Sequence, residues 1–122
     1  AAALATIDIF SEAGVYDRLH AMGRRLRESL GLALGQAGET AQVLGDGPLA
    51  QSVFLDRPVR SHRDWLAADR KRGRAVMLEM LRLGVFLNPM GTKLYLSLAH
   101  GEKEIDELAA HFAAALQATR PR

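Results

Sequence analysis

Four side chains that could take part in catalysis lie close together between residues 88 and 101, in the stretch NPMGTKLYLSLAHG. They are Thr92, Lys93, Ser97 and His100. A serine nucleophile of the G-x-S-x-G type stands on a sharp strand-to-helix turn, whereas Ser97 lies inside an alternating apolar run. A histidine that moves protons needs a partner within reach, and neither a carboxylate nor a nucleophile is placed beside His100 in the sequence. The stretch therefore predicts a turn, a strand and the lead-in to a helix, with His100 packed where the strand turns into the helix.

The other polar residues offer no metal site and no phosphate loop. The four histidines are scattered, and no two have the i, i+4 spacing of a helical metal site. Cysteine is absent, which excludes disulfides, thiolate catalysis and cysteine-ligated metals. The Gly-Asp-Gly-Pro segment at residues 45–48 is too short for a phosphate loop. We therefore expect this chain to supply no catalytic, cofactor-binding or metal-binding residue.

Basic residues are concentrated between positions 57 and 74. They are Arg57, Arg60, Arg63, Arg70, Lys71, Arg72 and Arg74. A nucleic-acid surface would be favoured by interleaved aromatic side chains, but only Trp65 is near, and the net charge of the chain is only +2. We interpret the cluster as a solvated face whose long side chains cover apolar surface with their stems.

Asp69 differs from its neighbours because it falls inside the apolar arc defined by Trp65, Val76 and Met80. A buried carboxylate without a partner is costly. A helix break near Ala68, with Asp69 as the N-cap of the helix that follows, removes this cost. We favour the capping role over a catalytic carboxylate.

The apolar spacing predicts an α+β domain. Helices are expected over residues 2–13, 15–37, 63–83 and 102–118, and strands over 41–47, 49–56, 85–88 and 93–99. The expected apolar positions are Leu4, Ile7 and Phe10 on the first helix, Leu19, Met22, Leu26, Leu30 and Ala33 on the second, and Gly73, Val76, Met77, Met80 and Leu81 on the third. Such an order predicts a small, mostly antiparallel sheet of three to four strands covered by helices.

Length and composition set further limits. The 122 residues are enough for one domain with a modest core, and 48% of them are hydrophobic. No apolar run is long enough for a membrane span, and the N-terminal stretch lacks the basic region of a secretory signal. The absence of cysteine agrees with a cytoplasmic protein. The chain begins inside a helical pattern without a Met or an N-cap residue, so we expect it to be cut from a longer polypeptide.

Three further stretches form a recognisable series along the chain. They are Pro58-Val59-Arg60 with the later Asp69, then Gly84-Val85-Phe86-Leu87 followed by Pro89, and finally Ser97 to Asp106 as S-x-A-H-G-x-x-x-I-D. Their order and spacing resemble the C-terminal small domain of fold-type I, pyridoxal-phosphate-dependent class III aminotransferases, especially the glutamate-1-semialdehyde 2,1-aminomutase branch. Under this resemblance, residues 1–13 are the end of an interdomain helix and residues 14–122 form the small domain.

The resemblance implies that the chemistry is carried by a large domain absent from this chain. That domain of the same polypeptide would hold pyridoxal 5'-phosphate (PLP) on a lysine, and the parent enzyme would be a homodimer acting on a small amino or keto substrate. None of the three lysines here, Lys71, Lys93 and Lys103, has the sequence context of the PLP lysine. The small domain would cap the active-site cleft without being catalytic alone. Its residues expected at the substrate entrance are Asn88, Pro89, Met90, Gly91, Thr92 and Lys93.

The entrance turn departs from the aminomutase pattern. That branch typically carries a longer segment with a Glu after the turn proline, where this chain has residues 90–93 as Met-Gly-Thr-Lys. Aminotransferase and aminomutase activity therefore both stay open. Two alternatives from other classes are a standalone α+β protein-interaction module and, less favoured, a basic nucleic-acid-binding domain.

Overall fold

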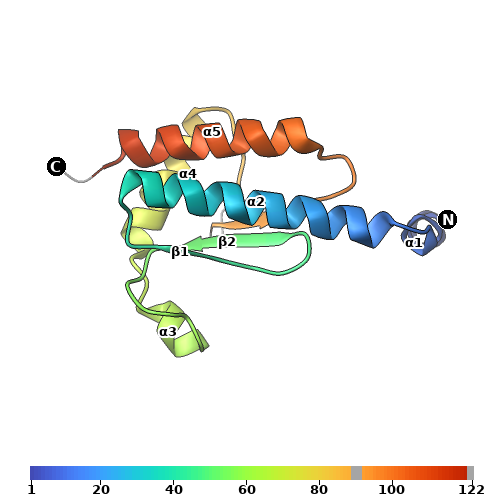
Figure 1. Ribbon diagram of the computed structural model, residues 1–122, viewed down its shortest axis with the longest axis horizontal. Coiled ribbons are helices and arrows are strands. Elements are labelled where there is room, and N and C mark those ends of the chain that lie inside the picture. Colours follow the sequence, from blue (N-terminus) through green and yellow to red (C-terminus); the bar gives the residue numbers. More distant parts are fainter. Residues whose placement is uncertain (89–91, 121–122) are drawn as a thin grey trace.

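The computed structural model describes residues 1–88 and 92–120. In that part of the chain the elements follow in the order α1 (Ala2–Ser11), α2 (Val15–Ala37), β1 (Gln42–Leu44), β2 (Leu49–Val53), α3 (His62–Leu66), α4 (Arg70–Arg82), β3 (Lys93–Tyr95) and α5 (Glu102–Ala118) (Figure 1). Pro89, Met90 and Gly91 of the expected entrance turn lie outside the described residues. None of the helices in the described ranges is long and apolar enough to cross a membrane.

The three strands form one antiparallel sheet in the order β1-β2-β3. Side chains alternate between the two faces of a strand, so the paired residues Ala50 and Leu94 lie on the same face, where both contribute to the core. The next pair, Leu49 and Tyr95, lies on the opposite face and is 44% and 55% exposed. The prediction of an α+β domain with a small antiparallel sheet is confirmed, with three strands among the described residues.

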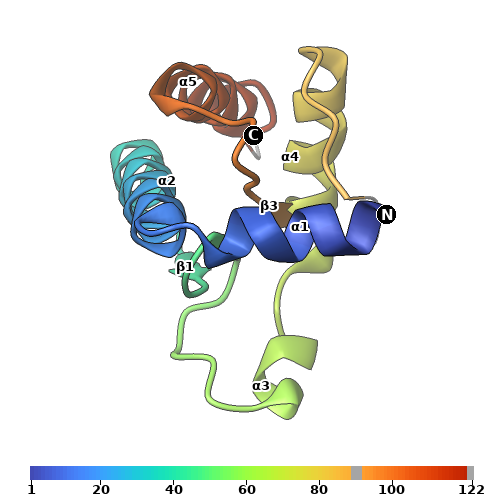
Figure 2. The same ribbon diagram turned by 90° about the vertical axis from the view of Figure 1, so that its right-hand side faces the viewer.

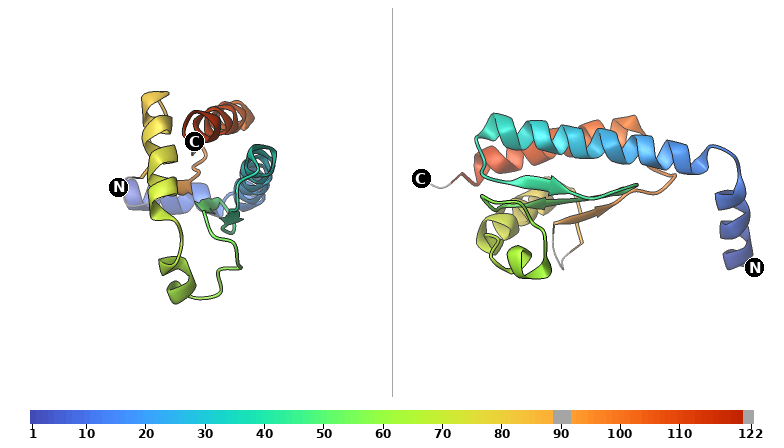
Figure 3. Two further views of the ribbon diagram at one scale, coloured as in Figure 1. Left: turned by 90° about the vertical axis from the view of Figure 1, so that its left-hand side faces the viewer. Right: turned by 60° about the horizontal axis from the view of Figure 1, so that its bottom comes forward.

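The core lies between this sheet and helices α2, α4 and α5. Helices α2 and α5 run side by side over the sheet (Figures 1 and 3). Leu26 and Leu30 of α2 share the core with Met80 of α4 and with Ile105 and Leu116 of α5, and none of these side chains is more than 1% exposed. Each such side chain contributes about 1.5–3 kcal/mol when it is removed from water. The apolar face predicted for residues 15–37 is therefore the face that is buried.

A glycine allows the loop between β1 and β2 to rest directly on α2. A Cβ atom at Gly23 would lie 1.8 Å from the carbonyl oxygen of Gly47, so no other residue fits there without a backbone shift. The same loop is fixed by Arg27, whose Nη1 donates to the carbonyl oxygens of Gly47 (2.7 Å) and Leu49 (2.9 Å). The hairpin is thus attached to the helix that covers it.

The helical region predicted over residues 63–83 is two helices, α3 and α4, with a break between them. The side chain of Asp69 accepts a hydrogen bond from the backbone N–H of Arg72 at 2.9 Å, which is the geometry of an N-cap. The Asp69 N–H donates to the carbonyl oxygen of Phe54 at 2.8 Å and ties the break to the end of β2. The capping role inferred for Asp69 is confirmed.

The strand predicted over residues 85–88 is wrong. Gly84 adopts a left-handed conformation (φ 90°), and the N–H groups of Gly84 and Val85 donate back to the carbonyl oxygens of Leu81 and Met80. This pattern closes the C-terminus of α4, so the Val85 N–H is used by the helix and not by a neighbouring strand. The prediction that Leu81 belongs to the buried stripe is also wrong, because its side chain is 50% exposed.

Helix α1 forms as predicted, but it buries none of its residues. Leu4 and Ile7 on the expected apolar face are 66% and 59% exposed, and the ring of Phe10 stacks on that of Tyr16 with centroids 5.6 Å apart. Gly14, with φ 85°, separates α1 from α2, and the two helices meet at a steep angle (Figure 2). The described residues therefore leave the apolar side of α1 uncovered.

Candidate functional site

The structure describes three of the six residues expected at the substrate entrance: Asn88, Thr92 and Lys93. The Thr92 hydroxyl donates to the carbonyl oxygen of Ser52 at 2.5 Å and so fixes the end of the turn to the middle strand β2. Lys93 begins β3 opposite Gln51, at the edge of the described sheet, and its side chain is exposed. An exposed lysine of this kind is common on an edge strand because it discourages further strand pairing. The entrance role of these residues stays a prediction.

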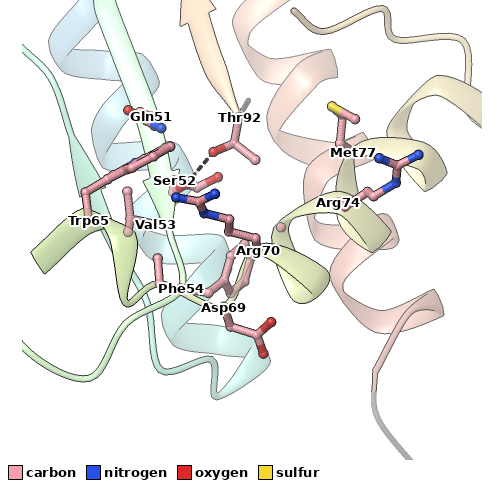
Figure 4. Close-up of a pocket in the computed structure, with 12 residues that line it drawn as sticks. Gln51, Ser52, Val53, Phe54, Trp65, Asp69, Arg70, Arg74, Met77 and Thr92 are labelled. Atoms are coloured by element: carbon pink, nitrogen blue, oxygen red, sulfur yellow. Dashed lines mark hydrogen bonds between the residues drawn. The ribbon is translucent and has the colours of Figure 1, made fainter. Parts of the chain in front are cut away.

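A pocket of about 250 Å³ opens beside Thr92, between β2, α3 and α4 (Figure 4). Its buried lining includes Val53, Phe54 and Gly73. Partly buried Trp65 and Met77 line it from α3 and α4. The pocket is formed by segments that come together only when the chain folds, so no sequence motif predicts it.

Two arginines from successive turns of α4 line this pocket. The guanidinium carbon of Arg70 lies 4.8 Å from the centre of the Trp65 ring, and the ring of His62 stacks on the same indole at 5.6 Å. Arg74 stands four residues further along the helix. Asp69 also lines the pocket, but it caps the helix, and Figure 4 shows its carboxylate turned away from Thr92. The pocket therefore combines apolar walls with two cationic groups.

A second hollow, of about 190 Å³, brings Asn88 and Lys93 together with His100 and Glu104. The pKa of the Glu104 carboxyl is held below its ordinary value chiefly by the backbone N–H of Gly101, which donates to it at 2.7 Å. This bond closes the first turn of α5, where the helix dipole favours a negative charge. The sequence placed these residues in different elements, and only the fold shows that they share one hollow.

Ser97 and His100 are in contact, although nothing in the sequence motif predicts a dyad. The Nδ1 atom of His100 lies 3.0 Å from the backbone N–H of Ser97, which donates to it, and 3.1 Å from the Ser97 Oγ. The backbone N–H of His100 in turn donates to the carbonyl oxygen of Ser97. In a catalytic triad the serine contacts Nε2 and leaves Nδ1 for a carboxylate. Here Nδ1 instead accepts the hydrogen bond from the backbone of Ser97, within the same turn. This supports the structural role expected for His100.

The basic cluster is a solvated face with one exception. Six of its members are exposed, namely Arg57, Arg60, Arg63, Arg70, Lys71 and Arg74. Arg72 is only 8% exposed, so its assignment to the solvated face is wrong. Its guanidinium forms an ion pair with Glu39 and donates to the carbonyl oxygens of Leu116 (3.0 Å) and Thr119 (2.9 Å). Because Glu39 follows α2 and the carbonyls belong to the end of α5, local sequence could not reveal this cluster.

Comparison with known proteins gives one consistent result. The chain is 36% identical to the glutamate-1-semialdehyde 2,1-aminomutase of Sorangium cellulosum over 118 residues, which are 96% of this chain and 27% of that enzyme. It is 35% identical to the aminomutase of Desulfosudis oleivorans over 107 residues, 87% of this chain and 25% of the relative. The chain resembles the C-terminal part of these enzymes. It spans about a quarter of the length of the curated relatives it matches, and no family model matches it.

Solved structures with a similar fold include class III aminotransferases as well. An omega-transaminase from Sphaerobacter thermophilus superposes with a TM-score of 0.82 at 29% sequence identity, covering 90% of this chain and 25% of that one. A glutamate-1-semialdehyde aminomutase from Pseudomonas aeruginosa has a TM-score of 0.80 over 88% of this chain and 24% of its own, but at 15% identity it shows only the shared fold. The predicted resemblance to the C-terminal part of class III aminotransferases is therefore confirmed.

The residues of this part do not fit a PLP site. PLP is held by a lysine together with an acidic group at its ring nitrogen. Lys71, Lys93 and Lys103 are all exposed, and the Lys103 ammonium lies 3.8 Å from the carboxylate of Glu107 on its own helix. In the described ranges no lysine stands in an enclosed cavity, and no group of three His, Asp or Glu residues could hold a metal ion. We therefore assign no catalytic step to this part of the chain.

Proposed function

We propose that the chain is the C-terminal domain of a PLP-dependent aminotransferase or aminomutase-like enzyme. The observation that carries this proposal is the 36% identity to an aminomutase over 96% of the chain. Under it, residues 1–13 are the end of an interdomain helix and residues 14–122 are the small domain. The exposed apolar side chains of α1, such as Leu4 and Ile7, support this division, because they lack a covering element in the described residues.

In the proposed enzyme, the large domain of the same polypeptide holds the cofactor. Bound PLP supplies the electron sink for moving an amino group to or from a small amino or keto substrate. The present chain covers the active-site cleft and helps to exclude water from it. Residues 88–93 lie at the substrate entrance, with their far end held in place by the bond from Thr92 to Ser52. The complete enzyme is proposed to be a cytoplasmic homodimer.

The reading frame and the cofactor spectrum test the proposal. We expect the gene to continue upstream of Ala1 for a few hundred codons. The purified full-length protein should absorb near the edge of the visible spectrum, and borohydride should fix the colour on a lysine encoded upstream. A gene that starts at Ala1, or a colourless full-length protein that takes up no PLP, would exclude the enzyme. Conversion of glutamate-1-semialdehyde, compared with transfer between amino and keto acids, then distinguishes aminomutase from aminotransferase.

The entrance role of the turn can be tested at Lys93. In the full-length enzyme, Lys93→Ala should raise KM for an anionic substrate about two- to fivefold and leave the cofactor spectrum unchanged, because an exposed cation contributes a modest attraction. Lys71→Ala is the matched control, since Lys71 is also exposed but lies on α4, where it lines neither the pocket beside Thr92 nor the hollow beside Asn88. Equal KM values for the two variants would place the entrance elsewhere.

A further inference from the structure

The two arginines that line the pocket beside Thr92 differ from several other arginines of the chain. Arg25, Arg57, Arg72 and Arg82 each lie within 4.0 Å of a carboxylate. Within the described ranges, Arg70 and Arg74 form no ion pair, and Arg70 instead lies over the ring of Trp65. Figure 4 shows the two guanidinium groups on opposite sides of the pocket, with Arg70 directed toward Trp65 and Arg74 on the side of Met77. The carboxylate of Asp69 also lines the pocket, but it caps α4 and forms no ion pair with either arginine, so the pocket can attract an anion.

Gly73 lies between these arginines and keeps the pocket open. A glycine inside a helix destabilises it relative to alanine, so its presence needs a reason. Packing does not supply one, because a Cβ atom at Gly73 would meet Phe54 and Thr92 at 3.7 Å, an ordinary contact. What the missing Cβ does leave is space in the lining of the pocket. Gly73 thus leaves volume free in the pocket, although alanine would stabilise the helix better at this position.

The lining also defines the chemical character of the ligand. Phe54, Met77 and the Trp65 ring are apolar or aromatic, whereas the cationic groups come from α4. Guanidinium groups bind a carboxylate through paired hydrogen bonds, and apolar walls favour an apolar body on the same molecule. A volume of about 250 Å³ suits a compound of amino-acid size. We infer that this pocket binds a small carboxylate whose apolar body lies against Phe54 and Met77 and whose charge lies between the cationic groups of Arg70 and Arg74.

The inference does not rest on the proposed enzymatic function, because it is argued only from the described residues of this chain that line the pocket. A parent protein without PLP would leave it untouched, and loss of carboxylate binding would leave the enzyme proposal untouched. The two can therefore fail separately.

Trp65 gives a direct optical readout, since it is the one tryptophan in the sequence and it lines the pocket. Titration of the 122-residue chain with 3-phenylpropanoate should change the fluorescence of Trp65 and reach saturation. The neutral amide of the same acid and inorganic phosphate serve as the comparison ligands. We expect each to bind at least about fivefold more weakly, because one lacks the charge and the other lacks the apolar body. Equal binding of the amide, or phosphate binding as tight as that of the acid, would overturn the inference.

Variants identify the residues responsible. Arg74→Gln should weaken 3-phenylpropanoate binding about fivefold, which is the scale of one partly exposed charged contact, whereas Arg24→Gln should leave it unchanged. Arg24 is the control because it is exposed on α2 and lines none of the pockets described above. Gly73→Ala should retain or raise the helical circular dichroism while weakening binding. Unchanged binding in both Arg74→Gln and Gly73→Ala, with the fold intact, would refute the assigned pocket.

Discussion

Replacement of Arg72 by methionine tests the buried cluster that joins three elements of the fold. Methionine keeps an unbranched stem near the Phe54 ring, over which the guanidinium carbon lies at 5.5 Å. The substitution removes the ion pair to Glu39 and both bonds to the carbonyl oxygens of Leu116 and Thr119. It therefore isolates the polar contacts from most of the packing.

The structure sets the size of the expected effect. Removing one partner of a buried ion pair costs about 3–5 kcal/mol, because the other charge stays buried without compensation. The side chains of Arg72 and Glu39 are 7% and 14% exposed, so Glu39 can recover some hydration and the lower end of that range applies. A loss of about 3 kcal/mol corresponds to a fall in Tm of about 10 °C for a chain of this length.

Urea and thermal unfolding measure this loss, and a double-mutant cycle with Glu39→Gln assigns it to the pair. We expect the double variant to be clearly more stable than the sum of the single losses predicts, because neither charge is then left alone. Arg82→Met is the control, since Arg82 pairs with Glu79 but is 69% exposed. The reasoning is refuted if Arg72→Met costs no more than the control, or if the two substitutions of the cycle are additive.

Three further predictions follow from local geometry. Gly23→Ala should lower the free energy of unfolding by about 2 kcal/mol or more in urea melts, because the new Cβ would collide with the Gly47 carbonyl. Asp69→Ala should cost about 1 kcal/mol and Asp69→Asn much less, since asparagine can still cap α4. The pKa of Glu104 is lowered in the folded chain, so its contribution is present above the ordinary value of 4.5 and is lost as the pH falls through the folded pKa. Glu104→Gln should therefore flatten the acid side of the stability profile, and an unchanged slope between about pH 3 and 5 would contradict the capping role.

Much of the fold could be predicted because its information is local. The three- and four-residue spacing from Leu19 to Ala33 gave α2 its face, and the structure places its bounds at the predicted residues. The position of Asp69 inside an apolar arc identified a helix break, and the structure confirms the cap. Both inferences depend only on residues within one or two turns of each other, where helix geometry alone decides the outcome.

The predictions that were wrong concern contacts between distant segments, or a backbone N–H group for which two structures compete. Residues 85–88 have a strand-like composition, but the Val85 N–H is already used to close α4. Arg72 was assigned to the surface because its partner Glu39 stands 33 residues away. The pocket beside Thr92 likewise combines three separate segments. No local sequence pattern encodes contacts between such distant segments. A glycine inside a helix, as at Gly73, is the one local signal that could have indicated the pocket.

The pairing of α2 with α5 has a consequence for how the chain is made. Leu30 and Leu116 share one core, yet most of the polypeptide separates them. Closing a loop of this length costs chain entropy before the contact is gained, so core formation is expected to be slow compared with that of a simple helical hairpin. On the ribosome, the apolar face of α2 is synthesised before α5 and is not covered by α5 until that helix has emerged. The nascent chain thus exposes this apolar face while residues 38–118 are being synthesised, and that interval is when it needs protection from aggregation.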